Sequence, residues 1–197
     1  MPDAQHEPIT IRPATPDDAL CLGVLGLQVF LDTYATEGIR APVAREVLAS
    51  YSTEQCLAHL LDANTLILVA ERGPCLLGFA QLSLRLPQPL APAGVQSELF
   101  RLYVQEPFTG SGLGTRLLHA AEQAAAQQGA TVLWLTLWVH NHRALGFYAA
   151  LGYEDFGQTW FCFEGEQHEN RLLARRLAAM SDTATRSTAP TPRAASA

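Results

Sequence analysis

The sequence predicts a single domain of the α+β (mixed α/β) class, and two patterns carry that prediction. Three strand-like segments follow one another at 66–70, 76–82 and 95–104, which favours an antiparallel meander. A strand–helix–strand order over 95–139 favours a parallel pair joined by a crossover helix. A length of 197 residues, 48% of them hydrophobic, suits one domain with a sizeable core.

The first part of the domain is expected to hold one short strand and several helical segments. Residues 9–11 alternate as a strand, and Thr15-Pro16-Asp17-Asp18 has the composition of a helix start. The apolar residues after it recur on one predicted helix face, at Leu20, Val24, Leu27 and Leu31. A second helix is expected over about 42–51, and Ser52 to Gln55 resembles a capping box that starts a further helical segment.

The second part alternates strands and helices. An amphipathic helix is expected over 112–128, and an apolar strand follows it over 132–139. A short helix over about 142–151 stops at a glycine, and two last strands are expected at 153–163 and 171–177.

The two ends of the chain lack such periodicity. Residues 1–8 are polar and acidic without a leader-like pattern, and they are expected to form a flexible N-terminus. The segment 181–197 is rich in Ala, Ser, Thr and Pro, and it is expected to be a disordered tail. Because no apolar run approaches the ~20 residues that span a bilayer, a cytoplasmic protein without a membrane partner is expected.

Charge and cysteine content narrow the possible functions. The net charge is −6 and all 13 basic residues are arginine, which argues against a nucleic-acid partner. An acidic protein is compatible with a cationic amine substrate, and equally with a charge that only keeps the protein soluble. The four cysteines are widely spaced, without a CxxC pair or a His/Cys cluster, so neither a metal site nor a disulfide framework is expected.

A glycine-rich loop at 109–115 is the densest chemical signal. Its glycines stand around the start of the helix expected over 112–128, where free backbone N–H groups can bind phosphate oxygens. A Walker A loop would need a lysine, and the chain has none. A dinucleotide fingerprint would need a glycine at the sixth position, where Thr115 or Leu117 stands instead. A flexible turn without a ligand is the remaining alternative.

Four segments follow one another in a characteristic order: Glu98-Leu-Phe-Arg-Leu-Tyr-Val104, the glycine loop, Trp134-Leu-Thr-Leu-Trp-Val-His-Asn141 and Ala144-Leu-Gly-Phe-Tyr-Ala-Ala-Leu-Gly-Tyr153. Together they resemble the GNAT superfamily of N-acetyltransferases. The resemblance implies an N-acetyltransferase domain over 9–180, with a central mixed sheet of about six to seven strands and about four flanking helices. It also implies acetyl-CoA as cosubstrate. The family's loop usually begins with Arg or Gln, where this chain has Thr109.

The resemblance further implies roles for individual residues. The strand around Leu102, Tyr103 and Val104 would offer main-chain groups to the pantetheine arm and to the thioester oxygen. Asn141 would contact the cofactor, although it is equally placed to cap the following helix. Tyr148 would protonate the departing thiolate, although an aromatic at this spacing can simply belong to the core. The pyrophosphate would lie on the backbone of Thr109, Gly110, Ser111, Gly112, Leu113, Gly114 and Thr115.

A base is needed because alkyl amines, with pKa values near ~10, arrive protonated. Glu98 is one candidate, since period-two counting puts it on the strand face of Leu102 and Val104, and a solvated strand acid is the alternative. His140 and His142 are further candidates. The helical region before residue 62 and the proline loop 86–94 are expected to frame the acceptor, with Asp32, Tyr34 and Glu37 as candidate contacts.

Two functions from different classes follow. The first is transfer of an acetyl group from acetyl-CoA to a primary amine, by direct attack in a ternary complex. The amine would belong to a small molecule, a polyamine or a peptide N-terminus. The second is a non-catalytic acyl-CoA sensor on the same fold, and a structural module with an empty loop is a third alternative. A homodimer is compatible with the family resemblance.

Overall fold

The computed structural model describes residues 7–163 and 166–178. The expected tail at 181–197 lies outside these residues, as does most of the expected N-terminal segment at 1–8. The strands are β1 (Thr10–Pro13), β2 (Thr65–Arg72), β3 (Cys75–Ser83), β4 (Gln96–Val104), β5 (Val132–Trp138), β6 (Glu154–Phe163) and β7 (Glu166–Arg176). The α-helices are α1 (Ala19–Tyr34), α2 (Ala41–Ser50), α3 (Thr53–Leu61), α4 (Leu113–Gln127) and α5 (His142–Ala150). Two 3₁₀ turns, η2 (Pro16–Asp18) and η3 (Glu106–Phe108), precede α1 and the glycine loop.

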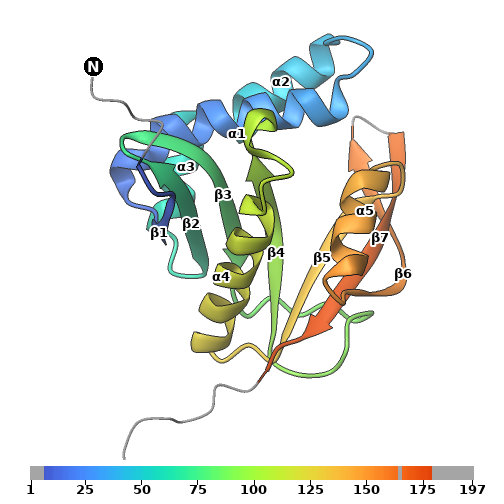
Figure 1. Cartoon of the computed structure of the whole chain (residues 1–197). Coiled ribbons are helices and arrows are strands. Elements are labelled where there is room, and N and C mark those ends of the chain that lie inside the picture. Colours follow the sequence, from blue (N-terminus) through green and yellow to red (C-terminus); the bar gives the residue numbers. More distant parts are fainter. Residues whose placement is uncertain (1–6, 164–165, 179–197) are drawn as a thin grey trace, which may run out of the picture.

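All seven described strands form one mixed sheet in the order β1-β2-β3-β4-β5-β7-β6 (Figure 1). The pairs β1–β2, β2–β3 and β3–β4 are antiparallel, and β4–β5 is parallel. The predicted meander and the predicted crossover pair are therefore both confirmed, as is the mixed fold class. The described residues contain five α-helices, one more than the family resemblance implied.

Local capping signals in the sequence set several helix starts. Thr15 and Asp18 form a reciprocal capping box around η2, from which α1 continues. The Ser52 hydroxyl accepts the backbone N–H of Gln55 at 3.1 Å and thereby caps α3, as predicted.

The predicted helix is confirmed as α1, and the apolar face singled out by its spacing is not the face that is buried. Leu20 and Val24 are 62% and 63% exposed, whereas Leu22 and Leu25 are buried. Apolar residues surround this helix, so their spacing does not single out one face. The choice depends instead on Gly23, where a Cβ atom would lie 2.4 Å from the Tyr51 carbonyl oxygen. A glycine lets the two backbones approach closely.

The helices cover the two faces of the sheet separately (Figure 1). We call the side covered by α4 and α5 the α4 face, and its core contains Leu82, Leu99, Leu117 and Tyr148. We call the opposite side the α1 face, where α1 and α3 pack on β2 and β3. No helix among the described residues is both long enough and apolar enough to cross a membrane.

The strands β4 and β5 separate along their length. Their parallel pairing covers three positions, from Gln96 opposite Val132 to Glu98 opposite Trp134. Beyond this point β4 stays paired with β3 as far as Val104, while β5 stays paired with β7 as far as Trp138. The edges of β4 and β5 that face each other therefore lack a strand partner there, which leaves main-chain polar groups available to a ligand.

Candidate active site

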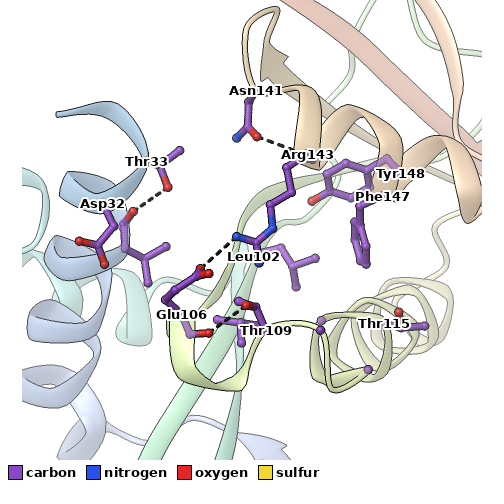
Figure 2. Close-up of a pocket in the computed structure, with 16 residues that line it drawn as sticks. Asp32, Thr33, Leu102, Glu106, Thr109, Thr115, Asn141, Arg143, Phe147 and Tyr148 are labelled. Carbon is purple, nitrogen blue, oxygen red and sulfur yellow. Dashed lines mark hydrogen bonds and ion pairs between the residues drawn. The ribbon is translucent and has the colours of Figure 1, made fainter. Parts of the chain in front are cut away.

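A pocket of about 780 Å³ lies at the opening between β4 and the start of α5. Figure 2 shows its walls, with α1 on one side, α5 on the other, and the loop and α4 below. It is lined by Val29, Asp32, Thr33, Leu102, Val104, Glu106, Thr109, Gly110, Gly112, Gly114, Thr115, Asn141, Arg143, Ala144, Phe147 and Tyr148. Most of the residues predicted from the sequence to hold the cofactor are in this set.

The glycine loop forms a compact turn at the start of α4. Gly110 and Gly112 have φ values of 71° and 82°, in the left-handed region that glycine adopts without strain. The Thr109 hydroxyl donates to the Glu106 carbonyl at 2.8 Å, and the Ser111 hydroxyl donates to the Phe108 carbonyl at 2.6 Å. These bonds hold the turn while the first backbone N–H groups of α4 have no partner within the helix. Such groups suit an anion.

Three predicted cofactor residues do not line the pocket with their side chains. The Tyr103 ring packs toward the α1 face, where its hydroxyl lies 3.0 Å from the Tyr51 hydroxyl. Leu113 is 1% exposed and belongs to the core beneath α4. The Ser111 side chain is bonded to its own turn. For these three positions, a role at the site would fall to the backbone.

Asn141 is the N-cap of α5, since its side-chain oxygen accepts the backbone N–H of Ala144 at 3.1 Å. The capping alternative is therefore confirmed. Asn141 also lines the pocket, so the cap and the site coincide at one residue.

Tyr148 is both a core residue and a pocket residue. Its side chain is 6% exposed and packs edge-on against Phe147 and Tyr153, with ring centroids 5.1 Å and 5.3 Å away. Figure 2 shows its hydroxyl directed toward the middle of the pocket. Burial raises the pKa of Tyr148, so the phenol keeps its proton at neutral pH and can donate it.

Glu98 lies on the α1 face, so the predicted shared face with Leu102 and Val104 is wrong. The register of β3 and β4 shifts between Gln81 and Leu82, which leaves Phe100 without a partner and reverses the alternation of β4. Leu99 consequently joins Leu102 and Val104 on the α4 face.

Burial raises the pKa of Glu98 to about 7, and a hydrogen bond with Ser83 opposes that rise. The side chain does not line the described pocket but stands where β4 and β5 part. The two histidines proposed as alternative bases, His140 and His142, are exposed and do not line it either.

Sequence reasoning missed an ion pair across the pocket. Arg143, in the first turn of α5, donates to the Glu106 carboxylate at 3.0 Å (Figure 2). Their separation of 37 residues hides the contact from any local pattern. Arg143 stands two residues after Asn141, and Glu106 stands three residues before Thr109 at the start of the glycine loop. Their closeness to these two predicted cofactor residues was the only sequence signal for a place at the site.

The predicted acceptor contacts do not gather in one place. Asp32 lines the pocket from α1. Tyr34 lies with its ring 6.0 Å from that of Trp138, which brings the end of α1 to the end of β5. Glu37 is exposed after α1 and does not line the described pocket. In the proline loop, the Leu86 carbonyl accepts the indole N–H of Trp134 at 3.0 Å, on the α1 face of β5.

Several solved structures share this fold. The PaiA N-acetyltransferase of Thermoplasma acidophilum, solved in complex with coenzyme A, aligns with a TM-score of 0.68 and 21% identity over 86% of this chain and 99% of that one. The structure of yncA from Salmonella typhimurium with its cofactor acetyl-CoA aligns with a TM-score of 0.61 and 21% identity, over 90% and 99% of the two chains. At these identities the likeness concerns the fold.

Sequence relatives extend over much of the chain. A thialysine N-epsilon-acetyltransferase of Bos taurus is 28% identical over 84% of this chain and 97% of its own length. The N-acetyltransferase Rv2669 of Mycobacterium tuberculosis is 30% identical over 68% and 81%. An N-acetyltransferase of Lactobacillus delbrueckii is 34% identical over 44% of this chain, which spans about half of that protein. The model of the acetyltransferase (GNAT) family matches residues 31–153, so this chain belongs to the GNAT family of acetyltransferases.

Proposed function

We propose that the protein transfers an acetyl group from acetyl-CoA to a primary amine by direct attack in a ternary complex. The observation that carries this proposal is the parting of β4 and β5 after Glu98, beside the glycine loop and Tyr148. A cosubstrate in the pocket would have its phosphates at the loop and its thioester at the unpaired edge of β4. The volume of about 780 Å³ is ample for a ligand of this kind.

Backbone groups and apolar side chains of the pocket support this placement. The turn at Gly110 and Gly112 leaves backbone N–H groups for the pyrophosphate. Leu102 and Val104 offer an apolar strand edge to the pantetheine arm, and an N–H group of that edge would stabilise negative charge on the thioester oxygen. Acetyl-CoA supplies an activated acetyl group as a thioester.

The proposed chemistry distributes two protons between two faces of the sheet. On the α1 face, Glu98 takes a proton from the ammonium form of the acceptor, directly or through water, and its pKa of about 7 suits that task near neutral pH. The amine nitrogen then forms a bond to the carbonyl carbon while the carbon–sulfur bond breaks. Tyr148, which lines the pocket, gives its proton to the departing sulfur. The nitrogen becomes positively charged when the new bond forms, and it releases its second proton through water, which restores the phenol of Tyr148. The products are an amide and the free thiol of coenzyme A.

A sequence relative suggests the class of acceptor. The relative from Bos taurus is named for acetylation of thialysine at its ε-amine. A small molecule with a primary amine on a flexible chain is therefore the first class to test, ahead of polyamines and peptide N-termini.

A thiol-release assay with acetyl-CoA tests the proposal. The panel contains thialysine, lysine, polyamines, aminoglycosides and short peptides, and the expected result is turnover with at least one small amine. Binding of acetyl-CoA by calorimetry without turnover of any amine would favour the sensor alternative. A protein that gains one acetyl group, labile to hydroxylamine, would overturn direct attack.

A further inference from the structure

The candidate pocket has an unexpected charge balance for a site proposed to hold a pyrophosphate. Among the described residues that line it, two carry a carboxylate, Asp32 and Glu106, and one carries a guanidinium, Arg143. The hydroxyls of Thr109 and Ser111 are already bonded to carbonyl groups of their own turn. Side-chain neutralisation of a bound pyrophosphate within this lining must therefore come from Arg143.

The position of Arg143 suits that role. It extends from the first turn of α5 across the pocket toward η3, opposite the glycine loop (Figure 2). Its Nη1 lies 3.0 Å from Oε2 of Glu106, and the two side chains are 65% and 67% exposed. A single carboxylate engages one part of the guanidinium fork, whose five N–H donors match phosphate oxygens in bidentate geometry.

The partner of Arg143 is easily replaced. An exposed ion pair between two long side chains contributes little free energy, because solvent screens it and both chains lose rotamer freedom. A pyrophosphate carries more charge than a carboxylate and is held from the other side by the loop N–H groups. Arg143 therefore gains free energy when it leaves the Glu106 carboxylate and binds a phosphate oxygen instead. The negative charge of Glu106 repels the same phosphate.

We propose that Arg143 binds the pyrophosphate of the acyl-CoA and that Glu106 is its competing partner in the absence of that ligand. This rests on the proposed function. In it, Arg143 takes over the charge that the loop lacks at Thr109, from a helix that lies about 30 residues further along the chain. Glu106 lowers the affinity for the cofactor both by occupying the guanidinium and by its own charge.

Isothermal titration calorimetry with coenzyme A and with 3′-dephospho-coenzyme A tests the proposal through binding alone. Arg143→Gln is expected to raise Kd about tenfold for both ligands, as loss of a charged hydrogen bond does. It should also reduce the dependence of Kd on salt concentration. Glu106→Gln is expected to lower Kd several-fold. Arg171→Gln and Asp155→Asn remove a less exposed ion pair of 2.8 Å on β6 and β7, outside the pocket lining, and they should leave Kd unchanged.

Each other outcome overturns a defined part of the proposal. An unchanged Kd in Arg143→Gln removes the role of Arg143, provided that the wild type binds coenzyme A. A loss seen with coenzyme A but not with the dephospho form would place Arg143 at the 3′-phosphate instead. Weaker binding by Glu106→Gln would mean that Glu106 positions Arg143 rather than competing for it. If the wild type binds no coenzyme A, the proposed function falls first and this inference with it. Thermal unfolding of each variant checks that the fold is retained.

Discussion

Glu98 is the last residue of β4 that pairs with β5, opposite Trp134, so the proposed base stands at the point from which the two strands diverge. The candidate pocket lies beyond that divergence, between α1 and α5 and beside the glycine loop, whereas the Glu98 carboxylate lies on the α1 face and does not line the pocket. In the proposed reaction, the acyl group would reach the gap from the candidate pocket, and the amine would reach it from the α1 face. This arrangement would explain why the candidate acid and the candidate base do not share one cavity.

Replacement of Glu98 by glutamine should remove the pH dependence near neutrality. The wild-type kcat/KM is expected to rise with pH through about 7, as the carboxylate that deprotonates the ammonium form loses its own proton. Glu98→Gln should lose this rise, depend instead on free amine with a pKa near ~10, and lower kcat/KM on the order of 100-fold at pH 7.5. Steady-state kinetics between pH 5.5 and 9 measure this, with Glu154→Gln as a control on an exposed strand acid. A surviving rise near pH 7 would exclude Glu98 as the base.

The same substitution should stabilise the fold at alkaline pH. The folded-state pKa of Glu98 is raised from 4.5 to about 7, so the protonated form favours folding. Its contribution is present below pH 4.5 and is lost as pH rises through about 7. Glu98→Gln stays neutral, and its free energy of unfolding should exceed that of the wild type by about 1–2 kcal/mol at pH 8, after allowance for partial exposure. The gain should shrink at pH 5. Urea unfolding at both pH values checks the sign, and an equal gain at both would contradict the burial argument.

Tyr148→Phe should slow the reaction without weakening cofactor binding. The phenyl ring preserves the packing against Phe147 and Tyr153, so the variant removes little except the proton donor. We expect kcat to fall on the order of 10- to 100-fold with little change in the Kd for coenzyme A. Tyr153→Phe is the matched control. The Tyr153 hydroxyl is buried outside the pocket lining and donates a hydrogen bond of 3.1 Å to the Glu122 carboxylate. Unchanged kcat in Tyr148→Phe would assign this tyrosine to the core alone.

The cap at Asn141 and its proposed contact with the cofactor can be separated by choice of substitution. Asn141→Ala removes the acceptor for the Ala144 N–H and should lower the free energy of unfolding by about 1 kcal/mol. Asn141→Asp keeps an acceptor and should retain that stability, while its charge should weaken binding of coenzyme A. Urea unfolding and calorimetry on the two variants measure these effects. If Asn141→Asp and the wild type bound coenzyme A with the same Kd, Asn141 would have no role in cofactor binding and would act only as the cap of α5.

The contrast between Ser52 and Glu98 shows which features the sequence could predict. A cap such as Ser52 with Gln55 involves neighbours in the chain, so residue type and spacing determine it. The face of Glu98 depends on a bulge at Phe100, which arises from pairing with β3 and leaves no mark on the alternation of β4 itself. The glycine loop and the β4–α4–β5 crossover could also be predicted, because each is a continuous segment of the sequence.

The pair Arg143 and Glu106 lies beyond local patterns for a different reason. Their contact depends on how α5 and η3 are placed across the pocket, which is a property of tertiary packing. Tertiary packing also determines which face of α1 is buried. Several sides of this helix are apolar, and the side that carries Gly23 is buried because the Tyr51 backbone approaches it closely. In each case a partner distant in sequence makes the choice.

Gly112→Ala should damage the loop through backbone conformation rather than through a clash. A Cβ atom at Gly112 meets no atom within 4 Å, yet its φ of 82° disfavours any other residue. Alanine there should lower the free energy of unfolding by about 1 kcal/mol. It should also displace the backbone N–H groups that the proposed pyrophosphate would use, which raises the Kd for coenzyme A.

Gly146→Ala is the matched control, because that position also has open space but lies within α5. Alanine in a helix should stabilise by about 0.5–1 kcal/mol there and leave binding intact. Thermal unfolding and calorimetry on the two variants compare the same added methyl group, and equal stability changes would refute the conformational argument.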